Sequence, residues 1–76
     1  MMKAKPIHLF NQNDTVKIEK LLFEKEDRET FQALGISQGA QAEILWKSGK
    51  KIILKTEENK LALSERAAEK ILASGL

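Results

Sequence analysis

Few side chains in this sequence have the chemistry for catalysis or metal binding. There is no cysteine, which excludes disulfides, thiolate zinc sites and cysteine nucleophiles. His8 is the sole histidine, and a lone histidine is far more often structural or exposed than metal-bound. The sequence contains neither a Gly-x-Ser-x-Gly elbow nor a Gly-x-x-x-x-Gly-Lys-Ser/Thr phosphate loop. We therefore predict no enzyme activity, no catalytic residue, no cofactor or metal, and no GTP binding by this chain itself.

An acidic stretch, Glu24 to Glu29, reads EKEDRE and is a second candidate for a cation site. Its carboxylates supply oxygen ligands, but they lack the fixed spacing and the sharp-turn glycine of a calcium loop. A solvated surface is the preferred interpretation. Arg28 could serve a GTPase partner as an arginine finger, but a surface helix arginine more often pairs with a nearby acid such as Glu24.

The third candidate is a basic stretch with an aromatic side chain, residues 46–55, which contains four lysines and no acid. The strand alternation favours a core position for Trp46. If Trp46 instead lies outside, we expect a partner-binding patch made by Trp46, Lys47, Lys50 and Lys51. The same 46–55 hairpin supports an alternative function, nucleic-acid binding through stacking and charge. The absence of arginine there argues against reading of bases, so we expect nucleic acid not to be the partner.

A single small domain, residues 1–76, must position these side chains. With 42% hydrophobic and 32% charged residues, the composition is that of a globular domain rather than a disordered chain. The net charge of +2 is too small to indicate nucleic-acid binding by itself. No apolar run exceeds three residues, and the first residues lack the apolar segment of a signal peptide. We therefore expect a cytoplasmic protein without direct membrane insertion, whose oligomeric state the sequence leaves open.

In the first half of the chain the pattern predicts one strand and one helix. Alternating β-branched and charged residues predict a strand over 15–23, with a bulge near 20–22 where the alternation fails. The spacing of Phe31 and Leu34 predicts a helix over 27–34 that begins at an Asp27 N-cap and ends before Gly35. Ile36 is expected to return to the core.

The second half predicts a hairpin followed by a short helix. Strands over 40–47 and 51–55 flank a Ser-Gly turn, and 61–63 is another short strand. Ser64 is expected to cap a helix over 65–70, whereas 71–74 fits either continued helix or a last strand. This pattern predicts a mainly β fold, a small barrel with one or two short helices, whose closure removes exposed sheet edges.

The order of these residues resembles the FeoA family. The first helix ends in Leu-Gly-Ile with a second glycine three residues later, a strand follows at 42–45, and a Leu-Ala-Leu-Ser strand precedes an Ala…Ile ending. The resemblance covers about residues 14–74, and its structural signature positions are Leu34, Gly35, Ile36, Gly39, Leu61, Ala62 and Leu63. Asn13 stands where the family usually has glycine, which suits a position of positive φ. Gln38 replaces a common proline, and the hairpin turn is shorter than in many members.

The resemblance implies an SH3-like β-barrel. It also implies a cytoplasmic accessory or regulatory protein of bacterial ferrous iron uptake, a non-catalytic interaction module that docks on the cytosolic side of the membrane transporter FeoB. Related domains occur at the C-terminus of DtxR-type metal-dependent repressors, so a stand-alone relative with another partner is a further possibility.

Overall fold

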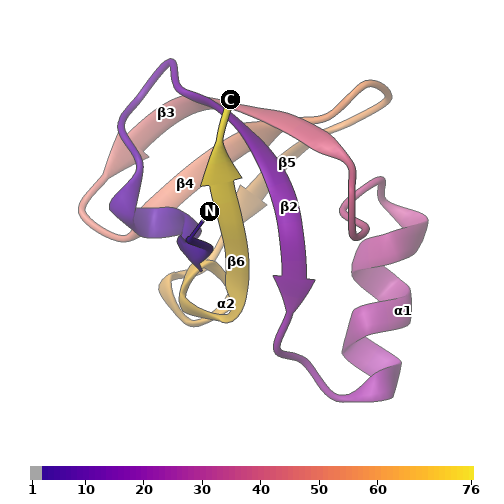
Figure 1. Ribbon diagram of the computed structural model, residues 1–76. Helices are drawn as coiled ribbons and strands as arrows, with labels where there is room; N and C mark the ends of the chain where they lie inside the picture. The colour runs from indigo at the N-terminus through magenta and orange to yellow at the C-terminus, as the bar shows by residue number, and fades with distance from the viewer. Residues whose placement is uncertain (1–2) are drawn as a thin grey trace.

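A six-stranded antiparallel sheet forms the domain, with the strand order β1-β6-β2-β3-β4-β5 (Figure 1). The computed structural model describes residues 3–76. Its elements are β1 (Lys5–Pro6), the 3-10 helix η1 (Ile7–Leu9), β2 (Thr15–Leu21), α1 (Lys25–Ala33), β3 (Gln41–Ser48), β4 (Lys51–Lys55), β5 (Lys60–Leu63), α2 (Glu65–Lys70) and β6 (Ile71–Gly75). The short helix α2 contacts both end strands, β1 and β5. The predicted mainly β, SH3-like fold with two short α-helices is therefore confirmed.

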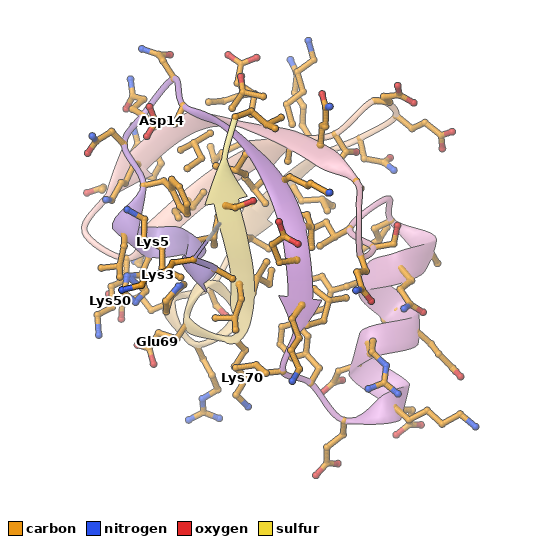
Figure 2. All side chains as sticks on the ribbon, viewed as in Figure 1. Lys3, Lys5, Asp14, Lys50, Glu69 and Lys70 are labelled. Atoms are coloured by element: carbon orange, nitrogen blue, oxygen red, sulfur yellow. The ribbon has the colours of Figure 1, made fainter. Side chains whose placement is uncertain are left out.

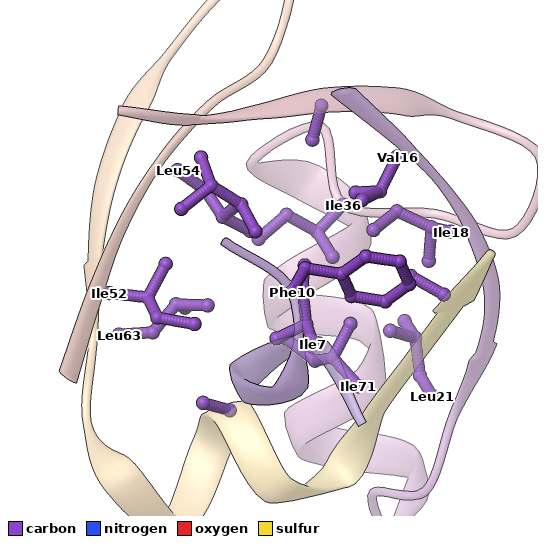
Figure 3. Packing of buried hydrophobic residues seen from close by; sticks show 14 residues of the cluster. Ile7, Phe10, Val16, Ile18, Leu21, Ile36, Ile52, Leu54, Leu63 and Ile71 are labelled. Atoms are coloured by element: carbon purple, nitrogen blue, oxygen red, sulfur yellow. The ribbon is translucent and has the colours of Figure 1, made fainter. Parts of the chain in front are cut away.

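One apolar cluster fills the space enclosed by the sheet (Figure 3). Alternate residues of each strand point into it, as the period of two requires: Val16 and Ile18 from β2, and Ile52 and Leu54 from β4. Ile36 is also fully buried, as predicted. Burial of a side chain of this size stabilises the fold by about 1.5–3 kcal/mol relative to exposure, so this cluster is the main source of stability.

Two bulges interrupt the alternation. In β2 the pairing with β6 shifts between Ile18 and Lys20, next to the predicted position. In β3 the pairing with β4 shifts between Ile44 and Trp46, so that Leu45 is an extra residue. A bulge places two residues opposite one and reverses the faces of the strand beyond it. This second bulge was not predicted from the sequence, and it changes the surface that the hairpin presents.

Helix α1 stands beside β2 at the margin of the sheet, and none of its residues is buried (Figure 1). The prediction of Asp27 as its N-cap was wrong. Helical geometry begins at Lys25 after Glu24, whose side chain makes no capping hydrogen bond, and the amide of Arg28 donates to the Glu24 carbonyl. Asp27 lies inside the first turn, where a carboxylate still interacts favourably with the helix dipole.

Residues 71–74, which fitted either helix or strand in the sequence, form a strand. Ser64 caps α2 as predicted, because its hydroxyl oxygen accepts a hydrogen bond of 3.1 Å from the amide of Ala67. The chain then leaves the helix at Ile71 and continues as β6, which lies between β1 and β2. The C-terminal residues are therefore a central strand rather than an extension of the helix.

Two backbone positions with positive φ confirm the turn chemistry. Asn13 has a φ of 77°, as expected for a residue that replaces a glycine, and its amide donates to the Ile44 carbonyl at 2.6 Å. Gly35 ends the α1 segment with a φ of 95°. A β-carbon at this position would lie 2.9 Å from the Thr56 hydroxyl oxygen, so space as well as conformation requires glycine there.

We expect Gly35→Ala to destabilise the domain more than Gly39→Ala. Both glycines have φ values near 90°, so each substitution costs about 1–2 kcal/mol of backbone strain. A β-carbon at Gly39 meets nothing within 4 Å, whereas at Gly35 it overpacks against Thr56, which costs about 1–3 kcal/mol more. Urea unfolding monitored by circular dichroism measures both free energies. Equal losses for the two variants would contradict the close approach to Thr56.

Candidate functional site

The structure separates the four residues predicted as a partner-binding patch. They lie on the β3–β4 hairpin, which turns at Gly49 and Lys50 with Ser48 opposite Lys51. Gly49 has a φ of 60° and Lys50 a negative φ, as a type II′ turn requires. The tip of this hairpin lies against η1 and α2, so part of its positive charge faces the protein rather than solvent (Figure 2).

The expectation of a core position for Trp46 was wrong, because its side chain is 45% exposed. Without the bulge, Trp46 would share the inward face with Ile44. The extra residue Leu45 shifts the register, so Trp46 lies opposite Ile53 on the outer face of the sheet. Lys47 takes the inward direction instead, opposite the buried Ile52.

Internal partners hold two of the predicted lysines. The Lys47 ammonium donates a hydrogen bond of 2.6 Å to the Phe10 carbonyl, and the Lys47 amide donates to the Gln12 side-chain oxygen at 3.2 Å. Lys50 forms an ion pair of 3.0 Å with Glu69 of α2 (Figure 2). Within residues 3–76 it is the only ion pair shorter than 4.0 Å. Of the four residues, Trp46 and Lys51 alone are exposed without a side-chain hydrogen bond or ion pair to the rest of the described chain.

The strand register places further residues beside Trp46 on the outer face of β3, β4 and β5. Trp46, Ile53 and Ala62 form one row across the three strands. Lys51 lies on one side of this row, and on the other side Lys55 lies directly opposite Lys60. We call this surface the Trp46 face and define it as Trp46, Ile53, Ala62, Lys51, Lys55 and Lys60.

Ile53, Lys55 and Lys60 were not predicted as members of the partner-binding patch, although the 46–55 hairpin considered for nucleic acid includes Ile53 and Lys55. The spacing within β4 indicated such a surface, because side chains two residues apart in a strand share a face and Lys51, Ile53 and Lys55 are spaced in this way. The sequence does not show which residues of β3 lie opposite which residues of β4. That pairing depends on Leu45, which has no partner in β4.

His8 lies in η1 beside the Lys50–Glu69 ion pair. Partial burial lowers the pKa of His8, and the positive charges of Lys50 and Lys47 lower it further. The ion pair raises the pKa of Lys50 and lowers the pKa of Glu69, mainly through their hydrogen bond. Nowhere in the described part of the chain do three His, Asp or Glu side chains come together to hold a metal ion.

The family-signature positions support the backbone near the end of α1. Ile36 and Leu63 are buried, Leu34 and Leu61 are half-buried, and the Leu34 carbonyl accepts a hydrogen bond of 2.9 Å from the Asn59 amide group. Gly35 and Gly39 border an open cleft of about 610 Å³ that also includes Thr56 and exposed Glu57 and Glu58 of the β4–β5 turn. Gly35 and Gly39, with their positive φ, thus shape the chain path beside this cleft. No helix within residues 3–76 is long and apolar enough to cross a membrane.

Comparisons with known proteins identify the fold and the family pattern. A family model described as FeoA domain matches residues 5–74. The NMR structure of a FeoA-like protein from Clostridium acetobutylicum is 26% identical, with a TM-score of 0.83, over 100% of this chain and 91% of that one. A crystal structure of an iron uptake regulatory protein (FeoA) is 17% identical, with a TM-score of 0.86, over 97% of this chain and 100% of that one.

The same fold occurs within a larger protein of another kind. A manganese-dependent transcriptional repressor is 18% identical, with a TM-score of 0.86, over 100% of this chain and 44% of that one. At this identity the likeness concerns the fold alone. No curated protein sequence matches the chain.

The outward position of Trp46 predicts a specific quenching pattern. Trp46 is the only tryptophan and the chain has no tyrosine, so its emission reports this side chain alone. We expect strong quenching by iodide and weaker quenching by caesium at equal ionic strength, because the nearby lysines attract anions. In urea-unfolded protein the difference should shrink. Weak quenching by both ions in the folded state would contradict an exposed Trp46.

His8 predicts a loss of stability in mild acid. Its pKa in the folded state lies below its ordinary value of 6.5, so the unfolded chain binds the proton more tightly. The free energy of unfolding should therefore fall as the pH drops below about 6.5, and less so in His8→Gln. Glu69 also has a lowered pKa, so its own contribution to stability is lost at lower pH, below its ordinary pKa of 4.5. Urea unfolding at about pH 7.5 and 5.5 measures the effect, and identical pH dependence in both proteins would contradict it.

Proposed function

The chain belongs to the FeoA family, and from this premise we propose that it is a non-catalytic accessory protein of ferrous iron uptake that docks on the cytosolic side of the FeoB transporter. The observation that carries this proposal is the match of the FeoA family model to residues 5–74, which is almost the whole chain. The whole domain, rather than one short motif, thus relates the chain to iron uptake.

The surface of the domain supports a role in binding. Trp46 is a large aromatic side chain that lies 45% exposed on a flat strand surface, next to Ile53. Aromatic side chains of this kind are enriched among the residues that dominate the binding energy of protein interfaces. A domain that binds one conformation of a transporter better than another shifts the transporter toward that conformation by its difference in affinity. Docking therefore suffices for regulation without chemistry on this chain.

The test is titration calorimetry of the chain against FeoB from the same organism. Full-length FeoB in lipid nanodiscs and its soluble GTP-binding domain are titrated separately, each with and without a non-hydrolysable GTP analogue. We expect saturable binding with a Kd of about 1 µM or tighter to at least the full-length transporter. We also expect no GTP hydrolysis by the chain alone. Empty nanodiscs of the same lipid are the control, and absence of binding to every form of FeoB would overturn the proposal.

Nucleic-acid binding is the second candidate, and the combination of an exposed Trp46 with Lys51, Lys55 and Lys60 on one face favours it. Stacking aromatics and cations on a small barrel are the features that bind single strands. Binding to oligonucleotides that weakens steeply with salt would support this alternative. Absence of binding to single-stranded DNA and RNA at low salt would exclude it.

A further inference from the structure

We propose that the Trp46 face is the surface by which this domain docks on its protein partner, and that the matching surface of the partner is acidic around an apolar contact. This inference rests on the proposed function, because it names the surface and the partner chemistry for the same docking event. The three residues of the apolar row and the three lysines around it carry the inference.

The apolar row supplies the centre of an interface. Trp46, Ile53 and Ala62 lie side by side on β3, β4 and β5, and each points to the outer face. Ile53 is half-buried and the other two are exposed, so a partner can still remove much apolar area from water. A central aromatic surrounded by polar residues is the usual anatomy of a protein interface.

The lysines around this row lack internal partners. Lys55 lies directly opposite Lys60 in the β4–β5 pairing, an arrangement of like charges that destabilises a sheet. Glu43 lies opposite Lys55 on the other side, but it forms no ion pair within 4.0 Å. Lys51 has no carboxylate within this distance either. Lys47 and Lys50 differ, because Phe10 and Glu69 hold them. The Trp46 face thus carries three lysines without an ion-pair partner beside one acid, Glu43, and this excess of positive charge around an apolar row complements an acidic partner.

This charge argues against a symmetric second copy as the occupant. A two-fold symmetric dimer through the Trp46 face would place Lys51, Lys55 and Lys60 of both copies against one another. Such a juxtaposition of like charges opposes association. An acidic protein surface with an apolar contact instead satisfies the lysines and covers Trp46 together.

The sharpest variant is Lys60→Glu, because it should improve folding and impair docking. It converts the Lys55–Lys60 pair into a pair of opposite charges across β4 and β5, so we expect a higher Tm. It also removes a cation from the Trp46 face, so we expect several-fold weaker binding to full-length FeoB in nanodiscs. A loss of affinity in a more stable protein is not a folding defect.

Trp46→Thr tests the apolar row, and two matched variants serve as controls. We expect Trp46→Thr to weaken binding about tenfold or more, since a central aromatic contact is lost while β propensity is kept. Leu22→Thr removes an apolar side chain of equal exposure (46% against 45%), and Lys20→Glu makes the same charge change on β2. Neither control residue belongs to the Trp46 face, so both should bind like the unchanged protein.

The outcomes separate this inference from the proposed function. Weaker binding of Lys60→Glu and Trp46→Thr, with both controls unchanged, would support the inference. If the unchanged chain binds FeoB and the two variants bind equally well, the inference is wrong while the proposed function stands. An effect of Trp46→Thr without one of Lys60→Glu would overturn the acidic partner surface. Equal binding to empty nanodiscs, or dimers that Trp46→Thr abolishes, would identify lipid or a second copy as the occupant. No binding to FeoB at all would overturn both proposals.

Discussion

A single extra residue in β3 decides which side chains of the hairpin reach solvent. Side chains of a strand alternate between two faces, so an insertion of one residue reverses every position beyond it. With Leu45 as the extra residue, Ile44 stays opposite the buried Leu54, while Trp46 turns outward and Lys47 inward. The inward lysine is tolerable because its ammonium donates a hydrogen bond to the Phe10 carbonyl. The bulge therefore lets β3 keep Ile44 in the core and still place Trp46, two residues later, on the outer face.

The lysines of the hairpin and of β5 fall into two groups, and the bulge decides the group of Lys47. Lys47 and Lys50 fasten the hairpin to the segment around η1 and to α2. There burial lowers the pKa of His8, and the charges of Lys50 and Lys47 lower it further. Lys51, Lys55 and Lys60 remain on the outer face without a carboxylate within 4.0 Å. An exposed ion pair such as Lys50–Glu69 contributes little to stability by itself. Its effect is to set one hairpin lysine beside a carboxylate of the same domain, so charge counted along the sequence overstates the positive charge left for a partner.

Local chemistry made much of the fold predictable from the sequence. Alternation of apolar and charged residues located β2, the Ser-Gly turn between two apolar runs located the β3–β4 hairpin, Ser64 marked the start of α2, and Asn13 indicated a left-handed turn. Each of these features depends on neighbours within a few residues. The Leu45 bulge depends on the pairing of β3 with β4, and the path of β6 depends on the space between β1 and β2. Such tertiary constraints override local patterns, so the orientation of Trp46 and the end of α2 could not be read from spacing.

Ala62 belongs both to the family signature and to the Trp46 face, but the other signature positions and the other residues of that face obey different constraints. Of the signature positions, Ile36 and Leu63 are buried and Gly35 and Gly39 have positive φ, so packing and backbone geometry account for their residue types. Trp46, Lys55 and Lys60 point outward, where the fold itself imposes no such requirement. A repressor at 18% identity shares the fold, as expected if the inward positions define it. The choice of partner must then reside in the outward residues, and in this chain the Trp46 face is the surface on which we propose that the choice is made.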